Sequence, residues 1–146
     1  MPYLERDFIM TDVVRKDVKQ RLENGDYSCA KELTLSMFSG KWKIVILFHL
    51  GTDGPYRFNQ LMRLLPKASH KVLTNQLREM EEDQLISRTV KSDSQIRVFY
   101  KITDLGRTLM PIINQMYKWG TNRIKQLQIS PKFNINEGGK KDSQTD

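Results

Sequence analysis

The segment from Ser69 to Met80 places the strongest constraint on how this chain can fold. At 3.6 residues per turn, Leu73, Leu77 and Met80 share one face, whereas polar and cationic side chains occupy the opposite face. Ser69 stands where an N-cap would begin the helix. We therefore predict a helix that starts at Ser69 and runs to about residue 83, with its apolar face packed on a small domain. A short cationic face of this kind suits the major groove of DNA.

The outward face of this predicted helix holds side chains that can contact base edges and phosphates. Asn75 suits an adenine edge, and Arg78 or Lys71 suits guanine. Thr74 suits a thymine methyl group or a phosphate. The candidate recognition residues are Ser69, His70, Lys71, Thr74, Asn75 and Arg78. Periodicity alone is equally compatible with a solvated amphipathic helix, and it does not decide which residue reads bases.

The segments around this helix predict a winged helix. A short helix over residues 57–65 and a turn at 66–68 come before it, which gives the length and pattern of a helix-turn-helix. Residues 85–91 and 96–102 alternate in polarity and should form a β-hairpin with its tip at 92–95. The expected fold class is mainly α with a small β-hairpin (α+β), a winged helix-turn-helix with dimerisation helices at both ends.

Further helices are expected on both sides of this unit. A period of four over residues 10–23 predicts a mostly polar helix whose narrow apolar stripe must pack on something, another subunit being one option. Residues 29–38 and 41–50 predict two more helices, followed by a turn at 51–55. After the hairpin, Thr103-Asp104 should cap one long helix that Pro111 kinks.

These segments predict four regions along the chain. The first is an N-terminal arm over residues 1–28, and the second is a winged-helix DNA-binding domain over 29–103. A C-terminal dimerisation helix over 104–129 and a disordered tail over 130–146 follow.

Basic side chains outside the recognition helix are candidates for holding the DNA backbone. The expected wing contacts are Lys91, Ser92, Gln95 and Arg97, which would rest on the minor groove or on phosphates, the alternative being an ordinary charged hairpin. The expected backbone contacts are Lys41, Arg57 and Lys67, at helix starts or in the turn before the recognition helix. Lys43 is a further candidate, although Lys41 and Lys43 fit a solvated face equally well.

Composition excludes several other functions. The net charge of +7 and the pI near 9.6 suit a polyanionic partner, although charge alone does not identify one. The apolar run over 44–48 is too short for a membrane span, and the early residues lack the apolar core of a signal peptide, so we expect a cytoplasmic protein without membrane contact. The two histidines, His49 and His70, lie in no catalytic or metal-ligand pattern. We therefore expect no catalytic residue, no enzyme activity, no metal and no cofactor.

The apolar side chains that follow the hairpin exceed what one small winged helix can bury. We predict that they form a homodimer interface together with the N-terminal arm. The candidate dimerisation residues are Leu109, Ile112, Ile113, Met116, Tyr117, Trp119, Ile124, Val14 and Val18. Two recognition helices would then lie about 34 Å apart, one turn of DNA, so the expected partner is double-stranded DNA with a pseudo-palindromic operator.

Five motifs in order resemble the HxlR family of bacterial transcription regulators, which are relatives of the MarR group. The motifs are Cys29, Gly40-Lys41-Trp42-Lys43, Arg57-Phe58-Asn59-Gln60-Leu61, Leu73-Thr74-Asn75-Gln76-Leu77-Arg78-Glu79-Met80-Glu81 and Tyr100-Lys101-Ile102-Thr103-Asp104-Leu105-Gly106. The resemblance covers about residues 27–120 and implies a homodimeric winged-helix DNA-binding protein. It also implies that many relatives respond to aldehydes, quinones or oxidants, in some of them through a cysteine at the position of Cys29. The arm over 1–24 is longer than the usual family start, so the resemblance implies no role for it.

Cys29 is the only cysteine in the sequence and has two readings. A free cysteine is usually a small buried hydrophobe. In the functional reading, a helix N-terminus and Lys31 favour the reactive thiolate, whereas Asp26 and Glu32 oppose it. A thiol switch would then act through a Cys29–Cys29 bond between subunits, a mixed disulfide or direct alkylation by a small electrophile or oxidant.

The sequence as a whole favours a homodimeric, sequence-specific regulator of transcription. Repression by excluding polymerase is the expected mode, with activation left open. The alternatives are a winged-helix module that binds proteins and an architectural protein that binds DNA without sequence preference.

Overall fold

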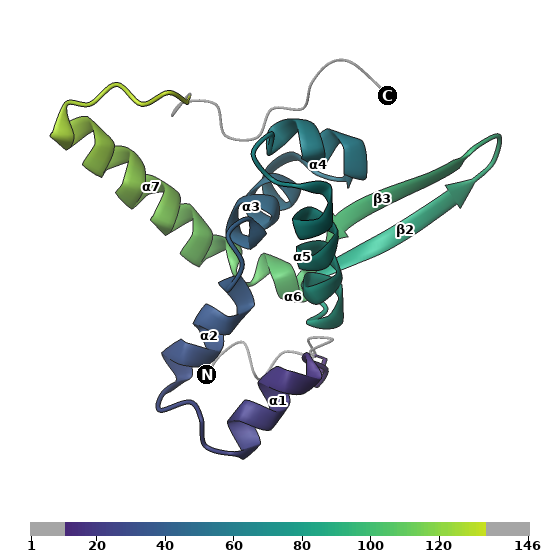
Figure 1. Ribbon diagram of the computed structural model, residues 1–146, viewed down its shortest axis with the longest axis horizontal. Helices are drawn as coiled ribbons and strands as arrows, with labels where there is room; N and C mark the ends of the chain where they lie inside the picture. The colour runs from purple at the N-terminus through teal and green to yellow at the C-terminus, as the bar shows by residue number, and fades with distance from the viewer. Residues whose placement is uncertain (1–10, 134–146) are drawn as a thin grey trace.

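A three-stranded sheet and the helices packed against it form the centre of the computed structural model, which describes residues 11–133 (Figure 1). The helices are α1 (Lys16–Glu23), α2 (Ala30–Phe38), α3 (Lys43–Asp53), α4 (Phe58–Leu64), α5 (His70–Glu82), α6 (Asp104–Arg107) and α7 (Met110–Leu127). The strands are β1 (Tyr56–Arg57), β2 (Ile86–Ser92) and β3 (Ile96–Ile102). This arrangement confirms the predicted α+β winged helix-turn-helix.

The sheet has the strand order β1-β3-β2, and both pairings are antiparallel. In the β2–β3 hairpin, Ile86 pairs with Ile102 at the base, and Ser92 pairs with Ile96 at the tip. Ile86 and Ile102 are buried, whereas β2 beyond Ile86 is exposed, so only the base of the hairpin belongs to the core. The rest projects as the wing. Strand β1, which the sequence analysis missed, has two residues and is too short to produce an alternating pattern.

The core gathers one apolar face from each of α3, α4 and α5 against the base of the sheet. Its fully buried members include Ile46, Leu47, Leu61, Leu73, Leu77 and Met80. Gly106 of α6 lets this helix approach the chain after α5, because a Cβ there would lie 2.2 Å from the carbonyl oxygen of Leu85. Thr103 fixes the same junction, since its Oγ1 donates to the carbonyl of Gln84 at 2.6 Å and accepts from the amide of Gly106 at 3.0 Å.

The N-terminal helix is shorter than predicted. Of the predicted helix over residues 10–23, α1 covers Lys16–Glu23, and Met10 lies outside the described residues. Residues 11–15 are not helical, because the amide of Arg15 donates to the Asp83 side chain at 2.9 Å instead of continuing a helix. Val18 of α1 is buried at 2 % exposure within this chain, and α1 packs on α2.

The long C-terminal helix is interrupted, and the prediction of one kinked helix was wrong. The structure has a short α6 and a separate α7, joined at Thr108 and Leu109. Pro111 lies in the first turn of α7, where its missing N–H has no helical partner to lose. The proline therefore fits a helix start and does not kink a continuous helix.

The segment after the core helix α3 also differs from expectation. The predicted helix over 41–50 continues to Asp53 as α3, so part of the predicted turn at 51–55 is helical. Helix α2 begins at Ala30 with Cys29 at its N-cap, and α4 and α5 match the predicted helix-turn-helix. Of the predicted disordered tail over 130–146, residues 134–146 lie outside the described residues.

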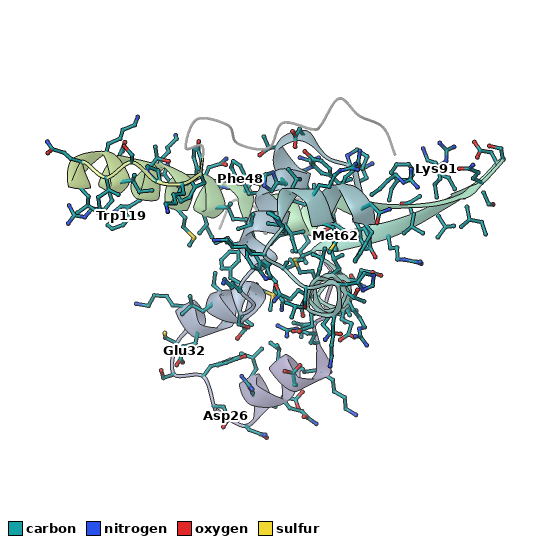
Figure 2. The ribbon with its side chains drawn as sticks, turned by 45° about the horizontal axis from the view of Figure 1, so that its top comes forward. Asp26, Glu32, Phe48, Met62, Lys91 and Trp119 are labelled. Carbon is teal, nitrogen blue, oxygen red and sulfur yellow. The ribbon has the colours of Figure 1, made fainter. Side chains whose placement is uncertain are left out.

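The wing and α7 extend from opposite sides of the core (Figure 1). Figure 2 shows the same separation in its labelled side chains, with Lys91 on the wing and Trp119 on α7 at opposite ends of the molecule. None of the helices within the described part of the chain combines the length and apolar character that crossing a bilayer requires.

Candidate nucleic-acid interface

Helix α5 has the two faces that the sequence predicts. Leu73, Leu77 and Met80 have exposures of 0 %, 1 % and 0 %, so one face is entirely inside the core. The side chains of the predicted recognition set, except Asn75, are exposed, and Asn75 is half-buried. Ser69 caps the helix, because its Oγ accepts from the amide of Val72 at 3.1 Å. The cap and the apolar face together fix the outer face in one orientation.

Several outer-face side chains of α5 already contact each other or their neighbours. Arg78 donates through Nη2 to the side-chain oxygen of Asn75, one turn earlier. Thr74 donates through Oγ1 to the carbonyl of His70 at 2.8 Å, and the ring of His70 lies 4.7 Å from that of Phe58. These contacts hold the polar side chains close to the helix before any ligand binds.

Arg88 joins this surface from β2, which the sequence analysis did not anticipate. A hollow of about 230 Å³ is lined by Phe58 of α4, by His70 and Thr74 of α5, and by Arg88, Val98 and Tyr100 of the sheet. Arg88 pairs with Tyr100 in the hairpin register, and its side chain is exposed. The alternation of polarity along the strand shows only on which face of the hairpin Arg88 lies. That Arg88 lies beside the start of α5 could be seen only in the tertiary structure.

The wing residues predicted to contact DNA are at the surface, but Arg97 is engaged within the wing. Lys91, Ser92 and Gln95 are exposed, and the Lys91 ammonium lies 5.3 Å from the centre of the Phe99 ring. The Nη2 of Arg97 donates to both carboxylate oxygens of Asp93, at 3.0 and 2.8 Å. The amide of Ser94 and the Arg97 guanidinium both hold the pKa of the Asp93 carboxyl below its usual range. The charge of Arg97 is therefore partly neutralised within the wing.

The basic side chains predicted at helix starts occupy two different environments. Lys41 and Lys67 are exposed, and Arg57 is half-buried at the N-cap of α4, where its amide donates to Gln60 Oε1 at 2.8 Å. Lys41 lies over the Trp42 ring, 4.8 Å from its centre. Lys43, by contrast, is fully buried and donates to Glu79 Oε2 at 3.0 Å, so its assignment as a backbone contact or as part of a solvated face was wrong.

Cys29 is exposed, so the reading as a buried hydrophobe does not describe it. The Glu32 carboxylate folds back over the start of α2, where it accepts from the amide and hydroxyl of Ser28 and from the amide of Cys29 at 3.2 Å. Hydrogen bonds from Ser28 hold the pKa of the Glu32 carboxyl below its usual range. The Cys29 thiol therefore lies beside both the Glu32 carboxylate and the N-terminal turn of α2.

The predicted dimerisation residues divide between core and surface. Val18 and Ile113 are buried within the chain itself, so their side chains already have apolar partners. Val14, Leu109 and Ile124 are partly buried. On α7 the exposed members are Ile112, Met116, Tyr117 and Trp119, and Trp119 has an exposure of 71 %. Ile112, Met116 and Trp119 follow the i, i+4, i+7 spacing of one helix face, and clustered exposed apolar side chains often mark an interaction site.

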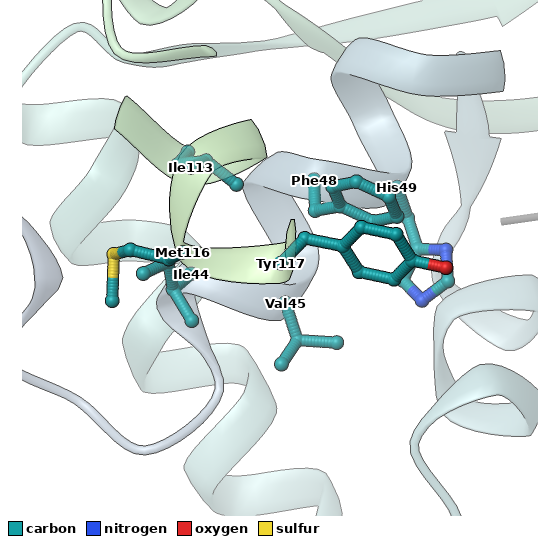
Figure 3. A pocket seen from close by; sticks show the side chains of 7 residues that line it. All are labelled: Ile44, Val45, Phe48, His49, Ile113, Met116 and Tyr117. Atoms are coloured by element: carbon teal, nitrogen blue, oxygen red, sulfur yellow. The ribbon is translucent and has the colours of Figure 1, made fainter. Parts of the chain in front are cut away.

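A groove of about 380 Å³ lies between α3 and α7 beside this apolar surface (Figure 3). Phe48 of α3 stacks on Tyr117 of α7 at a ring distance of 5.2 Å, and His49 lines the groove next to them. Within the described residues, Nδ1 of His49 is buried and has no hydrogen-bond partner. Burial lowers the pKa of His49 from its usual value, and the Asp53 carboxylate partly opposes this effect. The histidine is therefore held in its neutral form.

The described residues contain no group of three His, Cys, Asp or Glu side chains placed to hold a metal ion. The features that remain are an exposed cationic helix, a projecting basic hairpin and an apolar helix on the far side. These features can bind a polyanion and a second apolar surface.

Comparison with known proteins identifies the family. Residues 37–128 match the family described as HxlR-like helix-turn-helix. The candidate regulatory protein MalR of Fusobacterium mortiferum is 47 % identical over 94 residues, which are 64 % of this chain and 89 % of MalR. The uncharacterised HTH-type transcriptional regulator YdeP of Bacillus subtilis is 43 % identical over 107 residues, which are 71 % of this chain and 83 % of YdeP.

Solved structures give the same result. The redox regulator HypR in its reduced form is similar with a TM-score of 0.64 and 39 % identity, covering 68 % of this chain and 98 % of HypR. The HTH-type transcriptional regulator ytcD is similar with a TM-score of 0.63 and 42 % identity, covering 66 % of this chain and 98 % of ytcD. YdeP and ytcD are described as transcriptional regulators, and MalR and HypR are described as regulators. With its winged helix, exposed α5 and family match over residues 37–128, the chain belongs to the HxlR-like helix-turn-helix family of transcriptional regulators.

Proposed function

We propose that this chain is a homodimeric, sequence-specific DNA-binding regulator that inserts α5 into the major groove. The observation that carries the proposal is the division of α5 into a fully buried apolar face and an exposed face bearing Lys71, Thr74 and Arg78. In a helix-turn-helix, the second helix reads base edges with its outer residues. The net charge of +7 supplies the attraction to phosphates that does not depend on sequence.

The wing and the helix starts hold the DNA backbone in this proposal. Lys91, Ser92 and Gln95 are exposed on the wing, and Arg88 joins them nearer to α5. Lys41, Arg57 and Lys67 remain candidate backbone contacts. Contacts of this kind fix the register on the duplex, while the residues of α5 supply the sequence preference.

Dimerisation through α7 completes the proposed function. The exposed apolar side chains of α7 lie on the opposite side of the core from the wing, so a partner there leaves both DNA surfaces free. A twofold dimer presents two recognition helices about one DNA turn apart, which suits a pseudo-palindromic operator. Binding at such a site represses transcription when the operator overlaps the promoter.

We extend the proposal to a response at Cys29. The similar protein HypR is described as a redox regulator, and Cys29 is exposed at the start of α2. Oxidants, quinones or aldehydes that modify this thiol would shift the dimer toward a state with a different separation of the recognition helices. A Cys29→Ser variant is expected to keep its DNA complex when wild-type protein releases DNA under the same treatment. Release by both proteins would reject the role of Cys29.

The test of DNA binding is fluorescence anisotropy with the full chain, reduced, near physiological salt. The probes are the DNA upstream of its own gene and a scrambled duplex of equal length. A preference of about 10³-fold or more supports an operator-reading regulator. Equal binding to both duplexes would favour the architectural alternative, and no binding to either would favour the protein-interaction module.

Two variants sharpen this test. Arg78→Ala is expected to weaken operator binding by about 1–3 kcal/mol, with less effect on the scrambled duplex. Arg21→Ala on α1 is the matched control, because Arg21 is also exposed but lies outside the proposed DNA surface. Equal losses in the two variants would contradict the assignment of α5 as the recognition helix.

A further inference from the structure

Arg15, which immediately precedes α1 in the N-terminal arm, bonds two other parts of the chain, the C-terminal end of α5 and α2. Its amide and Nε donate to the two carboxylate oxygens of Asp83, at 2.9 and 2.8 Å. Its Nη1 donates to Glu79 Oε2, and its Nη2 donates to the carbonyl of Ser36 in α2 at 2.8 Å. Arg15 has an exposure of 8 %, and its bonds to Asp83 and to the Ser36 carbonyl are buried, whereas the bond to Glu79 is partly exposed.

The carboxylates that Arg15 contacts belong to the C-terminal end of α5. Glu79 lies one turn after Asn75, and Asp83 is the C-cap of the helix. Glu79 also accepts from the buried Lys43 of α3. One turn earlier, Gln76 Oε1 accepts from the amide of Trp42 at 2.9 Å. The inner side of α5 is therefore held by polar contacts to Arg15 and to the start of α3, in addition to its apolar face, and Arg15 in turn bonds α2.

These contacts constrain α5 more narrowly than apolar packing alone. Apolar side chains tolerate small rotations of a helix, whereas buried charges lose their partners when the helix shifts. Asp83 has an exposure of 1 %, and Arg15 is the cation that pairs with it. A rotation of α5 that moved Asp83 away from Arg15 would leave a buried carboxylate unpaired, which is strongly unfavourable.

We infer that Arg15 is a positioning residue for DNA recognition, which couples the N-terminal arm to the orientation of α5. The inference rests on the proposed DNA-binding function but uses residues outside the DNA surface. Arg15 and Ser36 precede residues 37–128, which match the family, so this coupling is built by a segment that the family match does not include. Displacement of the arm would release the C-terminal end of α5 and weaken operator binding without touching the DNA.

The test compares Arg15→Ala with Arg21→Ala in the full-length chain. Arg21 is the matched control, because it is an exposed arginine on the same arm. Arg15→Ala is expected to weaken operator binding at least tenfold, with an unchanged salt slope because buried Arg15 releases no counterion from DNA. Hydrogen exchange of the α5 amides in the free protein should become faster, whereas α4 keeps its protection. Arg21→Ala should change neither quantity.

The exchange measurement separates this inference from the proposed function. If wild-type protein shows no operator preference, the proposed function fails, and local loosening of α5 in Arg15→Ala still tests the coupling. Exchange that rises equally in α3, α4 and α5 indicates a purely structural role and overturns the inference. Unchanged operator affinity and α5 exchange in the folded variant overturn it as well.

A conservative variant keeps the test decisive if Arg15→Ala does not fold. Lysine retains the charge but cannot bond Asp83, Glu79 and the Ser36 carbonyl at once, because it lacks the guanidinium fork. Arg15→Lys is therefore expected to fold and to show a smaller, intermediate loss of affinity and of α5 protection. Wild-type values for both quantities in Arg15→Lys would overturn the inference.

Discussion

The ammonium nitrogen of Lys43 lies 3.0 Å from Glu79 Oε2, and the two side chains differ sharply in exposure, at 0 % for Lys43 and 38 % for Glu79. Lys43 reaches its partner from inside the core, at the start of α3, whereas Glu79 remains in contact with water. A buried cation depends on its counter-charge more strongly than a half-exposed carboxylate does. The two partners should therefore respond unequally to substitution.

We predict that Glu79→Ala destabilises the fold by about 3 kcal/mol, because it leaves the Lys43 charge buried and removes one partner of Arg15. Lys43→Met should cost less than about 1.5 kcal/mol, since Glu79 keeps Arg15 and water as partners and methionine fills a similar volume. Urea unfolding followed by circular dichroism measures both values. A larger loss for Lys43→Met than for Glu79→Ala would contradict the asymmetry.

The Asp93–Arg97 pair leads to a prediction about the wing. Asp93→Asn should raise the affinity for any duplex at low salt and steepen the salt dependence by about one unit, because it frees Arg97 and removes a negative charge. Anisotropy at several salt concentrations measures this slope. The control is Asp17→Asn on α1, which changes the net charge by the same amount but lies far from the wing. An equal gain in affinity for this variant would show that only the net charge matters.

His49 leads to a prediction about pH. Its folded pKa lies below the unfolded value of about 6.5, so the unfolded chain takes up the proton first as pH falls. The free energy of unfolding that depends on neutral His49 should therefore be fully present above about pH 6.5 and decrease as pH drops through that value. It should stop decreasing below the folded pKa of His49. His49→Gln should reduce the difference in unfolding free energy between pH 7.5 and pH 5.5.

The control for this prediction is His70→Gln, which removes the exposed histidine of α5. Urea unfolding at both pH values compares the wild-type protein with the two variants. All three proteins have the same carboxylates, so the carboxylate contributions to the pH dependence cancel in this comparison. If His49→Gln keeps the wild-type pH dependence and His70→Gln reduces it, the assignment to the buried imidazole is wrong.

Trp119 tests the dimer interface. Trp119→Glu places a charge in the exposed apolar surface of α7 and should weaken dimerisation at least a hundredfold, about 3 kcal/mol. Sedimentation equilibrium measures the change. Gln115→Glu adds the same charge to another exposed position of α7 and should have a smaller effect if Trp119 is central to the interface. A monomeric wild-type chain would refute the proposed homodimer.

Local patterns were sufficient to predict the central helix-turn-helix and its hairpin. The apolar period of Leu73, Leu77 and Met80 was confirmed as the buried face of α5, and Ser69 was confirmed as its cap. The alternation over 96–102 correctly predicted β3. These features depend on neighbours within a few residues, so the sequence displays them directly.

Other features were decided only when distant segments packed together. The sequence predicted Lys43 near the surface, but the tertiary structure buries it against Glu79, 36 positions away. Arg15 and Asp83 are 68 positions apart, and no local pattern connects them. Arg88 likewise reached the start of α5 only through the hairpin register. The sequence thus determined which faces are apolar or cationic. The tertiary structure decided which charges are paired, because ion pairing depends on distances between segments that are far apart in the chain, and local sequence patterns do not give these distances.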